Sequence, residues 1–306
     1  MWLHANRFEG CTRGAMDGAA TNGHLSVLQW LHANRSEGCT SLAMDKAAGT
    51  GHLSVVKFLH AHRSEGCTEQ AMDMAAARGH QSVVEWLHNN RSEGCSTWAI
   101  NQAAGKGNLS MLEWLYASRS HCCLEYAMDK AASNGHLDAV RWLHNTSRFA
   151  TCTTQAMDEA SENGHISVVM WLHANRFEGC TRGAMDGAAT NGHLSVLQWL
   201  HANRSEGCTT EAFQGAAMRD HLTIVEWLHA NRPYIFSTRS ITRAWGITHH
   251  VSDIGSYAVV KWLDDKYPRP YGYLHDTLDG YSSSEESKAN FWEKVEPEFR
   301  PKSVKV

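Results

Sequence analysis

Residues 43–70 read AMDKAAGTGHLSVVKFLHAHRSEGCTEQ, and this 28-residue pattern recurs along most of the chain. Closely similar stretches begin at Ala15, Ala71, Ala99, Ala127, Ala156, Ala184 and Ala212. A fixed period of this size is typical of stacked repeats, in which each unit contacts only its neighbours. We therefore predict a linear array rather than a single compact core.

Each repeat contains two apolar patterns separated by a glycine. Residues 43–48 place small apolar side chains at helical spacing, and Thr40 stands where it can cap that helix. Gly51 should end the helix, because glycine adopts positive φ without steric cost. Residues 53–59 supply the wide apolar stripe of a second helix. Neither helix is long enough to be stable alone, so the fold should depend on stacking.

This unit resembles the ankyrin repeat, whose signature is T-P-L-H-x-A followed by a glycine turn and a second helix. Ala-Met-Asp-Lys-Ala-Ala at residues 43–48 stands where the family has P-L-H-x-A-A, and Gly51-His52 with Val55-Val56 match the turn and second helix. The Thr-Pro pair is missing, Asp replaces the family His, and the unit is shorter than about 33 residues. The resemblance covers residues 2–230. It implies an all-α helix-turn-helix solenoid, ankyrin-like with short or absent β-hairpin fingers.

The repeats predict the domain organisation. An ankyrin-like array should span residues 1–240, with a partial unit at 1–14 and eight units from Ala15. Residues 241–265 end in an echo of a second helix and should form a degenerate closing unit. Residues 266–306 contain prolines, tyrosines and a serine-glutamate run, and are predicted to form a polar, partly ordered tail.

Two features interrupt the regularity. Residues 1–40 are identical to residues 170–209, so we expect a recent duplication, a start inside a longer repeat protein, or both. The unit 127–155 has one residue more than the others and a different loop, which predicts a local change in stacking at its end.

Composition bears on location and redox state. The chain has net charge −4 and 42% hydrophobic residues, and no apolar run approaches the roughly 18 residues of a membrane helix. Most of the nine cysteines occupy one point of the repeat. Stacked helices lie about 8–10 Å apart, whereas a disulfide needs Cα atoms within about 7 Å. We therefore predict reduced thiols and a cytoplasmic protein, with the nucleus as the alternative.

The twenty histidines and nine cysteines raise the alternative of a metal-binding protein. Within one repeat, however, His52 and Cys67 are predicted at opposite ends of a helix, roughly 15 Å apart, whereas structural zinc needs ligands that converge. The recurrent aspartate is replaced by Asn101 and Gln214 in two repeats, which indicates a hydrogen-bonding role rather than acid chemistry. No phosphate loop, nucleophile elbow or paired-carboxylate motif is present. We predict no catalytic residues, no metal and no cofactor.

Arginines repeat along one ridge at Arg35, Arg63 and Arg91, which raises a second alternative of nucleic-acid or phosphoinositide binding. Each arginine is followed by a glutamate two residues later, which favours ion pairs that staple the loops. The tryptophans share one position of the second helix with Phe58, which predicts a core ladder rather than a platform for bases.

Residues that vary between repeats are free to provide specificity. Steps of three or four place them on one face of the first helix, the face that lines the concave side of an ankyrin-like stack. The candidate partner-binding residues are Leu42, Lys46, Gln70, Met74, Arg78, Trp98, Gln102, Lys106, Tyr126, Lys130 and Glu159. Exposed tryptophan and tyrosine are common anchors of interfaces. The leading hypothesis is a monomeric, non-enzymatic scaffold that binds another protein, of unknown identity, on this face.

Overall fold

The computed structural model describes residues 11–118, 124, 126–146, 151–251 and 258–267, with side chains described except at 247–251. In these ranges the chain forms eighteen α-helices and one 3-10 helix, and no strand. The predicted all-α helical repeat solenoid is thereby confirmed. No helix in the same ranges is both long and apolar enough to cross a membrane.

Each repeat is a pair of helices. The first helices are α2 (Arg13–Thr21), α4 (Ser41–Gly49), α6 (Glu69–Ala77), α8 (Thr97–Gly105), α10 (Ala127–Ser133), α12 (Thr154–Glu162), α14 (Gly183–Thr190) and α16 (Thr210–Met218). The second helices are α3 (Leu25–Asn34), α5 (Leu53–His62), α7 (Gln81–Asn90), α9 (Leu109–Ser118), α11 (Leu137–Thr146), α13 (Ile166–Asn175), α15 (Leu194–Asn203) and α17 (Leu222–Asn231).

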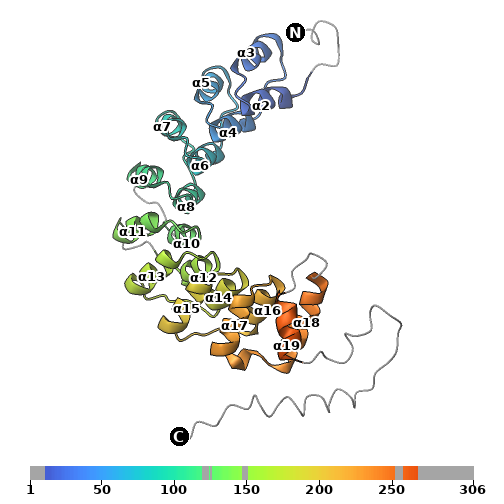
Figure 1. Cartoon of the computed structure of the whole chain (residues 1–306). Helices are drawn as coiled ribbons and strands as arrows, with labels where there is room; N and C mark the ends of the chain where they lie inside the picture. The colour runs from blue at the N-terminus through green and yellow to red at the C-terminus, as the bar shows by residue number, and fades with distance from the viewer. Residues whose placement is uncertain (1–10, 119–123, 125, 147–150, 252–257, 268–306) are drawn as a thin grey trace, which may run out of the picture. The chain divides into compact units, whose positions relative to one another are not determined.

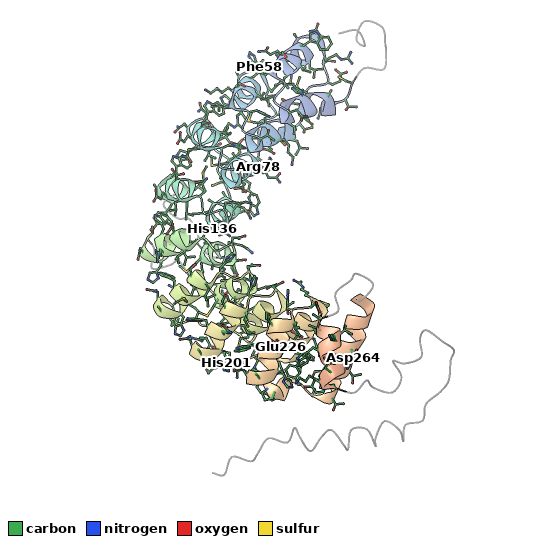
Figure 2. All side chains as sticks on the ribbon, viewed as in Figure 1. Phe58, Arg78, His136, His201, Glu226 and Asp264 are labelled. Atoms are coloured by element: carbon green, nitrogen blue, oxygen red, sulfur yellow. The ribbon has the colours of Figure 1, made fainter. Side chains whose placement is uncertain are left out.

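The chain divides into two units, here called the N-terminal half (up to Thr153) and the C-terminal half (from Thr154). Within each half, successive first helices pack directly on one another and form one layer, and the second helices form the other (Figure 1). In the N-terminal half, Phe58 lies in the layer of second helices and Arg78 at the layer of first helices (Figure 2). The two layers therefore present different side chains to solvent.

The ends of the first helices follow the predicted signals. The Thr40 hydroxyl accepts a hydrogen bond from Leu42 N–H at 3.2 Å, which confirms the N-cap. Gly51 has φ of 81°, and a Cβ added there would lie 2.7 Å from Nδ1 of His80 in the next repeat. Glycine is thus required both for the left-handed backbone and for the close approach of the neighbouring histidine.

The core consists of small residues between first helices and branched residues beneath the second. Ala43, Ala47, Val55 and Val56 are completely buried. The repeated tryptophans lie at the edge of this core and are half-buried. A ring of the preceding repeat meets Trp86, Trp114, Trp142, Trp199 and Trp227 edge-on, as His60 meets Trp86 at 5.1 Å. The tryptophan ladder is therefore an outer seam of the second helices rather than part of the fully buried core.

The last repeat of the array carries two further helices and a short 3-10 turn (η1, Pro233–Ile235). Helix α18 (Thr238–Val251) packs on α16, and α19 (Ala258–Lys266) packs on α17 and α18. Asp220 stands where other repeats have the turn glycine, with φ of 56°, and its Oδ1 accepts a hydrogen bond from Val259 N–H at 2.8 Å. This carboxylate ties α19 to the array.

Several predictions concern residues outside the described ranges. They include residues 1–10 of the partial unit predicted at 1–14, the irregular loop at 147–150, and the tail from residue 268 with its serine-glutamate run.

Candidate protein-binding face

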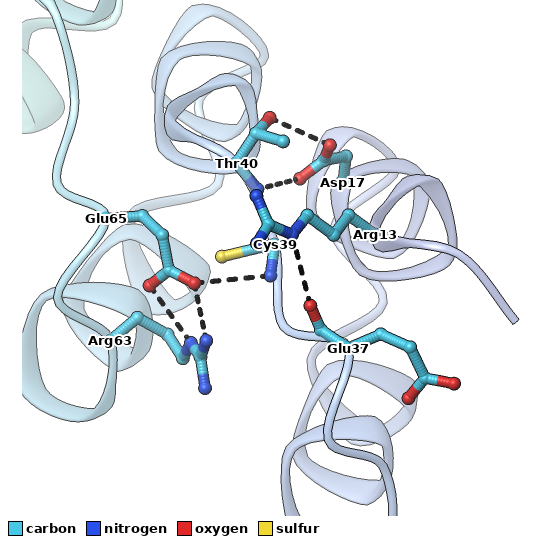
Figure 3. Close-up of polar contacts among 7 residues, drawn as sticks. All are labelled: Arg13, Asp17, Glu37, Cys39, Thr40, Arg63 and Glu65. Atoms are coloured by element: carbon cyan, nitrogen blue, oxygen red, sulfur yellow. Dashed lines mark hydrogen bonds and ion pairs between the residues drawn. The ribbon is translucent and has the colours of Figure 1, made fainter.

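A hydrogen-bonded ladder fixes most of the first helices to the loop that follows their repeat. Asp17 accepts bonds from the Thr40 backbone N–H at 2.8 Å and from its hydroxyl at 2.9 Å (Figure 3). The same pair of bonds recurs at Asp45–Thr68, Asp73–Ser96, Asp129–Thr153, Asp158–Thr181 and Asp186–Thr209. The predicted structural role of the aspartate is confirmed.

Two rungs of this ladder are missing among the described residues, at Asn101 of α8 and Gln214 of α16, and the first of them is explained by its surroundings. Asn101 replaces the aspartate, and the position of its threonine partner is occupied by the buried Leu124. The Asn101 Oδ1 atom is buried and has no hydrogen-bond partner among the described residues. Our expectation that the amide would keep the hydrogen bond is wrong at this repeat. The threonine that donates in other repeats is replaced by Leu124, just as the aspartate is replaced by Asn101.

The arginines of the ridge form ion pairs within the array. Arg63 forms an ion pair with Glu65, and Glu65 also accepts a hydrogen bond from Cys39 N–H of the preceding loop at 3.4 Å (Figure 3). The hydrogen bond from Arg63 lowers the pKa of Glu65 to about 2. Equivalent pairs form at Arg35–Glu37, Arg91–Glu93, Arg176–Glu178 and Arg204–Glu206. These guanidinium groups are occupied within the fold, which removes the support for a phosphate-binding ridge.

The described cysteines are free thiols, as predicted. Burial raises the pKa of Cys39, Cys67 and Cys180 to about 11, so these thiols are protonated at neutral pH and are poor nucleophiles. In the part of the chain that the structure describes, histidine, cysteine and carboxylate side chains form no group of three suited to a metal ion.

The first helices of the N-terminal half expose a row of large apolar side chains. Leu42, Trp98 and Tyr126 are 47%, 45% and 49% exposed, although neighbouring alanines are fully buried. Equivalent positions of stacked helices lie about 8–10 Å apart, so Trp98 and Tyr126 occupy the same position of two adjacent repeats. Large aromatic groups exposed in this way are typical of a surface that another molecule covers.

Tyr126 differs from its equivalents in backbone conformation. Leu42, Gln70 and Trp98 are the second residue of their helices, whereas α10 begins only at Ala127 and Tyr126 is its N-cap. Its φ of 66° lies in the left-handed region, which a residue with a bulky side chain rarely adopts. The ring is thus held on the exposed face by an unfavourable backbone conformation, a feature that clusters at functional sites.

The remaining candidates of this half lie on the same row of helices. Lys46, Gln70, Arg78, Lys106 and Lys130 are exposed, and Met74 and Gln102 are half-exposed. Together with Leu42, Trp98 and Tyr126 they form what is called here the first-helix strip. Glu159 lies on α12 in the C-terminal half, where it is half-buried, and does not belong to this strip.

A large side chain of the strip packs over a small residue of the preceding repeat. A Cβ added at Gly49 would lie 2.8 Å from the Cβ of Met74, and one added at Gly105 would lie 3.5 Å from the Cβ of Lys130. Arg78 also donates a hydrogen bond to the Gly49 carbonyl at 2.7 Å. Gly49 therefore makes room for Met74 of the next repeat, whereas the distance at Gly105 is an ordinary van der Waals contact. Repeat spacing alone did not reveal this pairing, although the recurrence of glycine and alanine at this position was a visible signal.

The strip is cationic. It carries Lys46, Arg78, Lys106 and Lys130 and no carboxylate. None of these four side chains pairs with an acidic group within the described ranges. The nearby Asp45, Asp73 and Asp129 are buried in the ladder, and Glu69 is an exposed carboxylate beside the strip in the first turn of α6.

Comparison with known families agrees with this architecture. The model of the family described as ankyrin repeats (many copies) matches residues 18–60, 44–88, 72–116, 100–144 and 157–201. A comparison with curated proteins finds no match. Ankyrin repeats are generally protein–protein interaction modules. The overlapping matches cover more than half of the sequence, and the chain belongs to the ankyrin-repeat family.

Proposed function

We propose that this chain is a non-enzymatic scaffold that binds another protein through the first-helix strip of its N-terminal half. The observation that carries the proposal is the exposure of Leu42, Trp98 and Tyr126 on the layer where neighbouring positions are buried alanines. Interfaces are anchored by a few such aromatic residues, while the surrounding polar side chains exclude water and fix register.

Recurrent and variable residues have different roles, and this difference supports the same function. The aspartate, arginine and glutamate side chains that recur are occupied within the array. The side chains of the strip make few hydrogen bonds or ion pairs within the array, so they are available to a partner. We also propose a monomer located in the cytoplasm, because the described cysteines are free thiols.

The test begins with a selection of peptides from a displayed random-peptide library on the full-length protein. Enriched peptides are synthesised, and their affinity is measured for wild type and for the Trp98→Ala, Tyr126→Ala double variant at matched helicity. We expect a loss of about 2 kcal/mol or more, or roughly 30-fold in affinity. The matched control is Phe177→Ala, which removes an aromatic ring that is 92% exposed but lies in a loop of the other half.

Peptides that bind the double variant as tightly as wild type would show that the strip is not the binding surface. Failure of the library to yield any peptide would also count against the proposal, because a strip with exposed aromatic anchors should bind short extended peptides. Loss of binding in Phe177→Ala would indicate that aromatic exposure in general, rather than the strip, drives capture.

A further inference from the structure

The charge of the first-helix strip restricts the kind of partner it fits. The positions equivalent to 42, 46 and 50 across the four repeats from Leu42 to Asn134 contain four cations and no carboxylate. This local excess is opposite in sign to the whole chain, whose net charge is −4. The strip is therefore a confined positive region on an otherwise slightly acidic protein.

The cations are arranged with the apolar anchors rather than apart from them. Trp98 and Lys106 belong to one repeat, and Tyr126 and Lys130 to the next. Rows about 8–10 Å apart correspond to about three residues of an extended chain at about 3.3 Å per residue. A linear segment of about nine or ten residues would thus cross the strip from Leu42 to Tyr126 and meet one cation and one anchor position about every third residue.

On the basis of the proposed function, we propose that the strip binds an acidic segment of a partner protein. Its carboxylates meet Lys46, Arg78, Lys106 and Lys130, and its apolar side chains cover Trp98 and Tyr126. The three lysines lie free of acidic partners in the described ranges, so binding does not require an internal ion pair to break. Arg78 uses one N–H for the Gly49 carbonyl and retains further donors.

Charge complementarity favours an acidic protein segment over a nucleic acid. A nucleic acid is a long polyanion, and the net negative charge of the chain would repel it. The ridge arginines, which could have extended a basic surface, are paired with glutamates. A short acidic segment needs only the four cations of the strip, and its leucine or aromatic residues use the exposed rings.

The experiment uses the enriched peptide pool from the random library on the full-length chain, read out by composition and affinity. We expect an excess of aspartate and glutamate together with large apolar residues, relative to the starting library. Affinity should weaken about tenfold or more when ionic strength rises from about 0.1 M to about 1 M, because the Debye length falls from about 10 Å to about 3 Å.

A matched pair of variants separates the strip from net charge. Lys46→Glu with Lys106→Glu reverses two cations of the strip, and should weaken the enriched peptides by about tenfold or more. Lys57→Glu with Arg141→Glu makes the same change in net charge on exposed positions of α5 and α11, the opposite layer, and should leave affinity within about twofold. Helicity and thermal midpoint are measured for both, so that unfolding is not mistaken for lost binding.

An enriched pool that is neutral or basic would overturn the inference about charge. The proposed function would still stand in that case if the pool lost affinity for the Trp98→Ala, Tyr126→Ala variant. Equal effects of the two charge-reversed variants would attribute binding to net charge and would also overturn it. A third probe, a single-stranded RNA oligonucleotide, would overturn it by binding more tightly than the peptides with dependence on Lys46 and Lys106.

Discussion

The two halves share a scaffold and differ on the face of their first helices. Both contain the aspartate ladder and the arginine-glutamate staples. At the positions equivalent to the first-helix strip, the C-terminal half carries glycines, two glutamates and one arginine, but no aromatic residue. These positions are Gln155, Glu159, Asn163, Gly183, Gly187, Asn191, Glu211, Gly215 and Arg219.

The pairing of large and small residues is also reversed between the halves. In the N-terminal half, Gly49 makes room for Met74 of the next repeat. In the C-terminal half the large residue comes first, because a Cβ added at Gly187 would lie 2.9 Å from the Cβ of Glu162. The same backbone stack therefore accepts either arrangement, and in the N-terminal half long side chains project from the middle of α4, α6, α8 and α10, whereas α2 has Gly18 at this position. The comparison teaches that the recurrent residues build the array, while this one pairing decides which chemistry its face displays.

The largest effect we expect separates a scaffold tryptophan from a strip tryptophan. Trp199 is half-buried and packs edge-on against His173 at 5.1 Å between ring centroids. Trp199→Ala should lower the free energy of unfolding by about 3 kcal/mol through lost packing. Trp98→Ala should lower it by less than about 0.5 kcal/mol, because that ring is 45% exposed. Urea titration of both variants provides the measurement. Equal losses would show that the strip holds the fold together.

The next effect tests the reversed size pairing directly. A Cβ added at Gly215 would lie 2.8 Å from the Cβ of Thr190, so Gly215→Met should destabilise the C-terminal half by about 2 kcal/mol through overpacking. Adding Thr190→Gly recreates the Gly49–Met74 arrangement and should recover most of the loss. The check is the denaturation midpoint of the single and double variants. A neutral single variant, or a double variant no better than the single, would mean that size complementarity does not set the face.

A smaller effect is expected where Asn101 interrupts the aspartate ladder. Asn101→Asp alone should destabilise the N-terminal half, because it buries a carboxylate without a donor. Combined with Leu124→Thr, it restores the two bonds seen at Asp73–Ser96. A double-mutant cycle should give a favourable coupling of about 1.5 kcal/mol. Strictly additive effects would contradict the role assigned to the ladder. The same cycle at the intact Asp186–Thr209 pair of the other half is the matched control.

The repeat pattern was sufficient to predict the helices and their limits. Thr40 as a cap, Gly51 as a stop and the apolar positions 53–59 act through local backbone chemistry, which the sequence displays directly. The structural role of Asp45 was also predictable, because amides replace it in other repeats. The lost bond at Asn101 was not, since it depends on a second change 23 positions later, at Leu124.

The candidate site was predictable in part. Helical spacing grouped the strip residues of the N-terminal half on one layer, because steps of three and four share a helix face. The left-handed backbone of Tyr126 was not foreseen, because the repeat pattern does not indicate that its helix starts later than the equivalent helices. Glu159 has the spacing of the strip residues but lies in the C-terminal half, so its role in binding stays a prediction.

The smallest effect we expect concerns Tyr126, where stability and binding should change in opposite directions. Tyr126→Gly relieves the cost of a side chain at φ of 66°, and should raise the free energy of unfolding by about 1 kcal/mol. It also removes an exposed ring from the strip, so the selected peptides should bind less tightly. Tyr126→Ala is the matched control, because it loses the ring but keeps a Cβ in the left-handed region and should gain no stability. Urea titration and peptide affinity are measured on both variants. If Tyr126→Gly lowers stability and leaves affinity unchanged, the ring serves the fold of the N-terminal half, and the contrast between its face and that of the C-terminal half loses one of its three apolar anchors.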